Sequence, residues 1–287
     1  MKYAYYPGCS LHSTAKEYDQ TSREVCHALG IELAEIDDWN CCGATSAHSL
    51  DHRLALELSA RNILLAQAER SDMAIPCASC FNNLKKASIE LEKNPAFARR
   101  MSEITGVTYH RKLQVKNLLD VVAGLDADLI KSKIVRPLKG LKVVSYYGCL
   151  LLRPPDMMKF DHPEQPESMD NLMEASGAEP VPWSYKTDCC GAGLTLTMTE
   201  VVVKLVGHIL IQAKQAGANC LVTACPMCMA NLDTRQAQAA EAAGEQFDLP
   251  VFYFTELLGL SFGMKGQDWW KKHLVDPSNL LFSIGLA

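Results

Sequence analysis

The segments CCG at residues 41–43 and CASC at residues 77–80 return later in the chain as CCG at 189–191 and CPMC at 225–228. Both repeats are separated by 148 positions, and the same shift carries Asn83 onto Asn231. Several matches at one offset indicate an internal duplication, because a fixed period is the signature of a repeated structural unit. The chain is therefore expected to fold as two similar halves.

A fifth repeated cysteine opens each half, Cys9 in the first and Cys149 in the second. These two are 140 positions apart instead of 148, so the second half carries eight extra residues before its CCG motif. The expected insertion is residues 154–168, which contain four of the 13 prolines. Because prolines interrupt regular structure, we predict a loop without helices or strands, of a kind that is often functional when long.

The segments between the cysteines predict alternating strands and helices in each half. The runs KYAYYPGC and LKVVSYYGC predict an opening strand that ends in a glycine turn at the first cysteine. Helices are predicted at 14–29, 52–70, 167–176 and 199–215, and apolar strands leading into the CxxC motifs at 73–76 and 221–224.

This alternation predicts a parallel α/β fold, made of two pseudo-symmetric halves with short parallel strands. Ligands in such sheets bind beyond the carboxyl ends of the strands, and all ten repeated cysteines are expected at those ends. The boundary is expected near 127–139, which divides the chain into a first cysteine-rich domain at 1–130 and a second one, with a C-terminal tail, at 131–287.

Composition narrows the class of protein. Apolar residues make up 48% of the 287 residues and charged residues 21%, which excludes a disordered chain. A net charge of −5 gives no electrostatic footprint for nucleic acid. The start MKYAYYPGCS lacks the features of a signal peptide, and the most apolar segment, 201–213, is interrupted by Lys204 and His208. We therefore expect a cytoplasmic protein with no transmembrane segment.

Twelve cysteines in a reducing compartment favour metal or redox chemistry over disulfides. A structural zinc ion takes four ligands, and so does an ordinary iron–sulfur cubane, whereas each half repeats five cysteines. Neighbouring cysteines reach one site only if the chain turns sharply, which Gly43 and Gly191 permit. Five thiolates fit a cubane plus a free redox thiol, or a cluster of unusual shape. Cys26 and Cys220 have no counterparts and are interpreted as buried apolar residues.

The cysteine pattern resembles that of the CCG-domain family of cysteine-rich proteins, over both halves of the chain. Each half reads as a cysteine, a spacer of 31 or 39 residues, a cysteine pair, 34 residues and CxxC. With the opening YYPGCSL, the chain is most similar within that family to the B subunits of heterodisulfide reductase.

The resemblance implies two noncubane [4Fe-4S] clusters, one in each half, with a disulfide substrate held between them and reduced to two thiols. Carried over residue by residue, the ligands of one cluster are Cys9, Cys41, Cys42, Cys77 and Cys80, and those of the other are Cys149, Cys189, Cys190, Cys225 and Cys228. The bacterial ferredoxin motif is absent, so the expected partners are a ferredoxin-like subunit with cubane clusters and a flavin-containing subunit.

Two alternatives remain at this point. One is an iron–sulfur electron-transfer subunit of a lactate- or glycolate-type dehydrogenase, which uses the same CCG repeats. The other is a zinc-stabilised assembly module without catalysis, which metal analysis distinguishes.

Several residues outside the repeat are weaker candidates for function. His12 and His48 lie near predicted site loops and are candidate proton donors. Trp269 and Trp270 in the tail indicate core packing or docking to a partner rather than membrane contact. A basic group is a candidate entry for an anionic substrate or, more simply, a solvated face; it comprises Lys85, Lys86, Arg111, Lys112 and Lys116.

Overall fold

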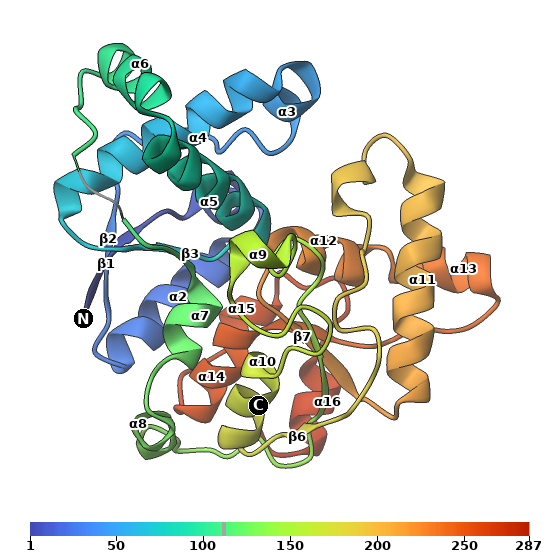
Figure 1. Ribbon diagram of the computed structural model, residues 1–287. Helices are drawn as coiled ribbons and strands as arrows, with labels where there is room; N and C mark the ends of the chain where they lie inside the picture. The colour runs from blue at the N-terminus through green and yellow to red at the C-terminus, as the bar shows by residue number, and fades with distance from the viewer. Residues whose placement is uncertain (111–112, 287) are drawn as a thin grey trace.

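A computed structural model of the protein describes residues 1–110 and 113–286, and it contains two four-stranded parallel sheets (Figure 1). The strand order is β2-β1-β3-β4 in the first sheet and β6-β5-β7-β8 in the second. The strands are β1 (Lys2–Tyr5), β2 (Glu32–Glu35), β3 (Met73–Ile75), β4 (Val115–Asn117), β5 (Lys142–Tyr146), β6 (Glu179–Pro180), β7 (Cys220–Thr223) and β8 (Val251–Tyr253). The two orders are equivalent under the duplication, which confirms the predicted α/β class with two repeated halves.

Helices connect the strands, as parallel pairing requires. In the first half they are α1 (Gly8–His12), α2 (Lys16–Ala28), α3 (Ser46–Leu50), α4 (His52–Ala66), the 3-10 turn η1 (Gln67–Glu69), α5 (Ala78–Lys93), α6 (Pro95–Thr105), α7 (Leu118–Ala123) and α8 (Ala127–Ser132). In the second half they are α9 (Pro155–Met158), α10 (Ser168–Ala175), the 3-10 turn η2 (Ala192–Leu194), α11 (Thr199–Gln215), α12 (Pro226–Thr234), α13 (Gln236–Ala243), α14 (Phe254–Ser261), α15 (Gln267–Trp270) and α16 (Ser278–Ser283).

The predicted helices lie within a few residues of the observed ones, and the prediction for 199–215 coincides with α11. The central strands β3 and β7 are buried along their whole length, because helices cover both faces of a parallel sheet. The strands of the first sheet lie within residues 2–117 and those of the second within residues 142–253. The domain boundary at residue 130 stays a prediction.

The two halves pack against each other through two equivalent pairs of helices. Helix α2 of the first half contacts α14 of the second, and their repeat equivalents, α10 and α7, contact each other in the same way. At the first contact the ring of Tyr18 stacks on that of Tyr253, with centroids 4.0 Å apart and an interplanar angle of 2°. The hydroxyl oxygens of Thr21 and Thr255 lie 2.7 Å apart and are buried. The reciprocal contacts are those of a pseudo-twofold arrangement.

The insertion at 154–168 was predicted to lack regular structure, and this was wrong in part. It contains the short helix α9, which begins with Pro155 at the first helical position, where proline is favoured because its missing N–H is not needed there. Helix α9 packs against α5 of the first half. Asn82 in α5 donates to the carbonyl oxygens of Leu150 at 3.0 Å and Arg153 at 2.8 Å, so the segment that leads into the insertion is bonded to the first half.

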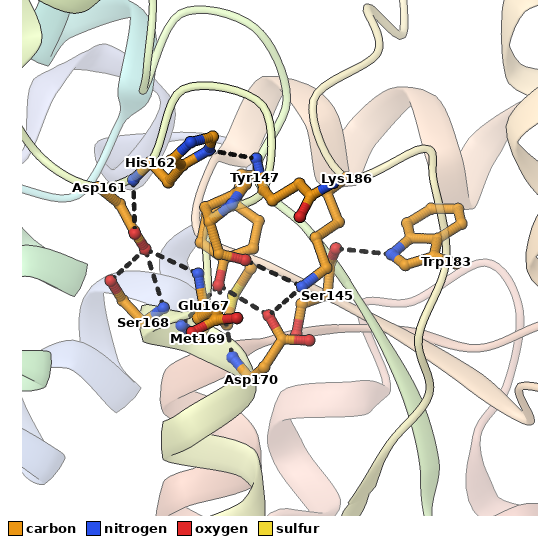
Figure 2. A network of polar contacts seen from close by, with 12 residues as sticks. Ser145, Tyr147, Asp161, His162, Glu167, Ser168, Met169, Asp170, Trp183 and Lys186 are labelled. Carbon is orange, nitrogen blue, oxygen red and sulfur yellow. Dashed lines mark hydrogen bonds and ion pairs between the residues drawn. The ribbon is translucent and has the colours of Figure 1, made fainter.

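The far end of the insertion is held by one carboxylate (Figure 2). Asp161 accepts hydrogen bonds from the backbone N–H groups of Glu167 at 3.0 Å and Ser168 at 2.8 Å, where α10 begins. Nearby, Asp170 accepts from the hydroxyl of Tyr147 at 2.9 Å and from Lys186 at 3.0 Å. This network connects the insertion to the segment that follows β5.

Candidate functional site

The repeated cysteines lie at the carboxyl ends of the strands in both sheets. Cys9 is in α1, which follows β1, and Cys77 precedes the first turn of α5, which contains Cys80. Cys225 and Cys228 occupy the same places at the start of α12. A strand that ends in a helix N-terminus gives CxxC two sulfurs on the same edge of the sheet, since positions three apart share a helix face.

Each half gathers its sulfur atoms into direct contacts. The Sγ atoms of Cys42 and Cys80 lie 3.3 Å apart in the first half, and those of Cys149 and Cys189 lie 3.7 Å apart in the second. The remaining contacts within the halves are Cys9 with Cys41, Cys41 with Cys42, Cys77 with Cys80, Cys190 with Cys228 and Cys225 with Cys228. All 12 cysteines are free thiols.

The two sulfur sets meet where the halves meet. Cys77 of the first half contacts Cys225 of the second, and both side chains are buried. Contacts with the thiols of Cys228 and Cys77 lower the pKa of Cys225, and the backbone N–H of Ala78, from the other half, lowers it further. The contact with Cys225 raises the pKa of Cys77. The contact across the halves therefore shifts the pKa values of the two cysteines in opposite directions.

Hydrogen bonds to the CCG turns are repeated in both halves. The hydroxyl of Tyr6 donates to the carbonyl oxygen of Asn40 at 2.7 Å, and that of Tyr146 donates to the carbonyl oxygen of Asp188 at 2.6 Å. Each acceptor is the residue before the cysteine pair, so these tyrosines position the turn. They were not predicted as site residues, although both stand three places before the first cysteine of their half.

A repeated asparagine holds the other side of each turn. Asn83 donates to the carbonyl oxygen of Cys42 at 3.2 Å, and Asn231 donates to that of Cys190 at 2.9 Å. The shift of 148 already related these asparagines in the sequence. Their function in the turn becomes visible only in the structure, because it depends on α5 and α12 packing beside the CCG loops.

Glycines allow the backbone to approach the sulfurs. At Gly8 and Gly148 φ is +71° and +68°, and a Cβ atom would lie 3.1 Å from the Sγ atoms of Cys80 and Cys228, respectively. Such φ values favour glycine because a Cβ atom clashes with the backbone there. These two positions therefore form part of the wall around the sulfur atoms.

The CCG turn lowers the pKa of one exposed cysteine in each half. Contacts with the thiols of Cys42 and Cys9, and the backbone N–H of Gly43, lower the pKa of Cys41 well below its usual range. Contact with the Cys149 thiol, aided by the N–H of Gly191 against the effect of burial, lowers the pKa of Cys189 to about 6. The thiolate is the form of cysteine that binds metals and attacks electrophiles.

The two candidate histidines lie in different surroundings. His12 is exposed in α1, with its Nε2 atom 3.0 Å from the Oε1 atom of Glu35 and its ring against Trp39 at 4.9 Å. His48 is exposed in α3, and its ring packs edge to face on His52 at 4.4 Å. Only His12 belongs to a helix that contains a repeated cysteine.

The candidate basic entry is only partly described. Lys85 donates to the carbonyl oxygen of Val115 at 3.3 Å. Val115 is the first residue of β4, whereas the cysteines lie at the carboxyl ends of the strands, so this bond is at the other edge of the sheet. Lys85 and Lys116 both act on the carboxylate of Asp120. Arg111 and Lys112 lie outside the described residues.

The structure confirms two interpretations made from the sequence. Cys26 and Cys220 have no exposed surface, and burial alone raises the pKa of Cys26 to about 12, as expected for packed thiols away from the other sulfurs. Trp269 and Trp270 are buried, in agreement with core packing. Within residues 1–110 and 113–286, no helix is both long and apolar enough to cross a bilayer.

The donor set suits a sulfur-ligated group by its chemistry. Iron–sulfur clusters are held by cysteine thiolates, and each half offers five free thiols at one sheet edge. The sulfurs meet in a chain of pairs: among the described residues, no three or more His, Cys, Asp or Glu side chains are arranged to hold a metal ion. The thiols therefore fit such a group in kind and number.

Comparison with known proteins agrees with this chemistry. A family model described as a cysteine-rich domain, CCG, matches residues 3–85 and 143–233. The 8-methylmenaquinol:fumarate reductase membrane anchor subunit of Wolinella succinogenes is 31% identical over 281 residues, covering 97% of this chain and 99% of that protein. The B subunit of the ferredoxin:CoB-CoM heterodisulfide reductase of Methanosarcina mazei is 28% identical over 269 residues, covering 91% of this chain and 89% of that protein.

The fold is similar to that of a solved structure. The crystal structure of a hypothetical protein from Helicobacter pylori superposes with a TM-score of 0.76 at 12% identity, over 96% of this chain and 52% of that one. At this identity the likeness concerns the fold alone. The family match covers the cysteine sets of both halves up to and beyond each CxxC motif. The chain therefore belongs to the CCG cysteine-rich domain family, and it resembles heterodisulfide reductase B subunits along most of its length.

Proposed function

We propose that this protein is the catalytic iron–sulfur subunit of a heterodisulfide reductase-type complex, which reduces a disulfide to two thiols. The contact between Cys77 and Cys225 is the observation that carries the proposal, because it joins one cysteine of each repeated set where the two halves meet. A disulfide has two sulfur atoms and takes up two electrons on cleavage. Two like sites facing each other suit such a substrate. The related B subunits support the coarser role of an iron–sulfur oxidoreductase subunit.

The ten repeated cysteines are the proposed ligands of two noncubane [4Fe-4S] clusters. Five are in the first half, namely Cys9, Cys41, Cys42, Cys77 and Cys80, and five are in the second, namely Cys149, Cys189, Cys190, Cys225 and Cys228. When bound, each cluster would supply one electron to the substrate. The protein itself shapes the site: the glycines admit the sulfurs, and Tyr6, Tyr146 and the repeated asparagines fix the CCG turns.

Cleavage of a disulfide to two thiols also consumes two protons. On the exposed side of the first half, His12 is the proposed donor, because its pairing with Glu35 orients the imidazole at the end of α1, the helix that also carries Cys9. His48 is a second proposed donor, in the short helix α3 that follows the first CCG motif. A ferredoxin-like subunit and a flavin-containing subunit are the proposed electron suppliers, and the cytoplasm is the proposed compartment.

Anaerobic purification followed by iron and sulfide analysis and low-temperature electron paramagnetic resonance tests the proposal. We expect iron and acid-labile sulfide in both halves, and disulfide-dependent oxidation of the reduced protein. Changing Cys80 or Cys228 to Ser should abolish turnover, whereas the matched control Cys26→Ala, at a cysteine outside the sulfur sets, should retain it. Zinc without iron, or full activity with one half's set disrupted, contradicts the proposal.

A second candidate is an electron-transfer subunit of a quinol:fumarate reductase-type complex, because the Wolinella succinogenes relative matches the chain over nearly its full length. Such a subunit passes electrons between a quinol and a partner without cleaving a disulfide. Reduction of the iron-loaded protein by a naphthoquinol, with no oxidation by any disulfide, would favour this candidate over the first.

A further inference from the structure

Each tyrosine that is bonded to a CCG turn has a tryptophan ring beside it. The ring centroids of Tyr6 and Trp39 are 5.4 Å apart, and those of Tyr146 and Trp183 are 6.4 Å apart. The chain has four tryptophans, and these are the two that lie outside the C-terminal tail. They are separated by 144 positions, so neither the shift of 140 nor that of 148 relates them. The same aromatic pairing is therefore present in both halves at tryptophan positions that the sequence repeat does not match.

In the second half this pairing starts at the sulfur set. A Cβ atom at Gly148 would lie 3.1 Å from the Sγ atom of Cys228 and 3.5 Å from the Cε1 atom of Tyr146. The ring and the sulfur therefore border the space of a single methyl group. The hydroxyl of Tyr146 donates to the carbonyl oxygen of Asp188 at 2.6 Å, directly before Cys189. Both the edge and the hydroxyl end of this ring are thus held against the cysteine set.

From Trp183 the ring contacts continue to the surface. The centroid of the Trp183 ring is 6.2 Å from that of Tyr185, which is 5.0 Å from that of His208 in α11. These separations are those of aromatic rings in contact, about 4.5–7 Å. Trp183 and Tyr185 are half-buried and His208 is exposed, so burial in the core does not account for their alignment. Tyr146, Trp183, Tyr185 and His208 are called the aromatic row below.

The hydrogen bonds along the aromatic row decide which ring can lose a proton. The Nε1–H of Trp183 donates to the carbonyl oxygen of Ser145 at 3.0 Å (Figure 2). A backbone carbonyl does not take up this proton, so Trp183 can pass an electron only while it keeps its N–H. The hydroxyl oxygen of Tyr185 lies 3.1 Å from the Nε2 atom of His208. Since a neutral imidazole nitrogen can accept a proton, Tyr185 is the ring that can lose an electron and a proton together.

We propose that the aromatic row carries oxidising equivalents away from the second sulfur set and so protects its cysteines from peroxide. The oxidant is a hydroxyl radical, formed when peroxide meets ferrous iron at the set; with one electron and one proton from water it becomes water. The electron leaves Tyr185 and passes through Trp183 and Tyr146, while the phenol proton moves to His208. A soluble reductant of the ascorbate class then returns one electron to Tyr185, and His208 returns the proton.

Such protection suits a site built from thiols, because oxidation of a cysteine beyond the sulfenic acid is irreversible. The aromatic row does not compete with disulfide reduction, because tyrosine and tryptophan are oxidised only at potentials far above those at which disulfides take up electrons. The first half has a shorter form of the same arrangement. There the Nε1–H of Trp39 donates to the Oε1 atom of Glu35 at 3.0 Å, and a carboxylate can accept that proton.

The test mixes reduced, iron-loaded full-length protein with hydrogen peroxide and freezes it for electron paramagnetic resonance, while peptide mass spectrometry locates the oxidised side chains. We expect a tyrosyl radical in the wild type and oxidation at Tyr185. Tyr185→Phe should lose the radical and release iron faster under the same peroxide. Trp183→Phe should also lose the radical, although Tyr185 is intact, because phenylalanine is not oxidised under these conditions. His208→Ala should lose the radical and regain it with added imidazole, a rescue that a purely structural role does not give.

The matched control is Tyr3→Phe. Tyr3 is a half-buried tyrosine near the amino end of β1, at the opposite end of that strand from the cysteines, so this variant should keep the radical. Metal-free wild type should form none. Absence of a tyrosyl radical in the folded, iron-loaded wild type overturns the proposal. So does its persistence in Trp183→Phe, or equal oxidation of Tyr185 in the metal-free protein, since either result means direct attack from solution.

A second measurement separates this inference from the proposed function, because it needs neither iron nor a disulfide. A ruthenium photo-oxidant is attached to Cys189 in metal-free protein in which the other accessible thiols of the two sets, Cys9, Cys41 and Cys149, are changed to Ser. Flash oxidation should produce the transient absorption of a tyrosyl radical, and Trp183→Phe should abolish it. If the wild type binds no iron, the proposed cofactor fails and this measurement decides the route. An equal radical yield in both proteins overturns it.

Discussion

An equivalent asparagine holds each CCG turn, but only the turn of the first half has a second side-chain donor among the described residues. In the first half the carbonyl oxygen of Cys42 accepts from Asn83 at 3.2 Å and also from the hydroxyl of Ser59 at 2.7 Å. In the second half the position of Ser59 is taken by Gly207. Among the described residues, Asn231 is the side chain that donates to the carbonyl oxygen of Cys190. Removal of the asparagine is therefore predicted to matter more in the second half.

The size of the predicted destabilisation follows from the hydrogen-bonding groups that each asparagine substitution leaves without a partner. Asn231→Ala leaves the buried Cys190 carbonyl unpaired, at about 1–3 kcal/mol, and removes the bond from the Thr195 hydroxyl at 2.8 Å, at about 1 kcal/mol. Asn83→Ala removes one bond, at about 1 kcal/mol, and leaves Cys42 satisfied by Ser59. The expected difference of about 2 kcal/mol is roughly a 30-fold difference in the equilibrium for opening the turn.

Pulse alkylation of the reduced, metal-free protein, read by mass spectrometry, measures that opening directly at Cys190 and Cys42. Urea unfolding measures the corresponding global change. Gly207→Ser tests the explanation, because a Cβ atom at Gly207 would meet Ala239 at an ordinary 3.6 Å and would carry a hydroxyl like that of Ser59. Combined with Asn231→Ala, it should recover part of the loss. Equal effects of the two asparagine variants would refute the reasoning.

Three further predictions concern the sulfur wall and the buried ion pair of Glu256 with His273. Gly148→Ala should lower the free energy of unfolding by at least about 1–2 kcal/mol, since φ is +68° and the added Cβ would lie 3.1 Å from the sulfur of Cys228. Urea titration measures this free energy, and an unchanged value would contradict the prediction. In the metal-free protein Cys189, with a pKa of about 6, should gain reactivity toward iodoacetamide as pH rises through 6; an inflection near pH 8.5 argues against the thiolate. Glu256 helps raise the folded-state pKa of His273, so this ion pair should stabilise the fold fully below the unfolded pKa near 6.5 and lose this effect as the pH rises through the folded pKa. His273→Gln should flatten this pH dependence of stability, measured by urea unfolding at a series of pH values. An unchanged dependence in the variant counts against the prediction.

Some features of the site left a signal in the sequence that was too weak to interpret. The repeated asparagines were visible as matches at the shift of 148, and the tyrosines stood at one distance before the first cysteine of each half. A match at a fixed offset shows that a residue type recurs, but it names no partner. The insertion was misjudged because prolines interrupt a helix in its interior yet favour its first position.

The amino-acid sequence by itself determined the duplication, the α/β class and the two groups of five cysteines, because burial periodicity and motif spacing are local properties of the chain. Only the tertiary structure decided that Cys77 meets Cys225, that α2 packs on α14, and that Glu256 and His273 share a buried bond. The first two of these contacts form only when two complete halves pack together, and the third only when the C-terminal segment folds back onto α14. Periodicity tells which side chains are buried, whereas the packing of one element on another selects their neighbours.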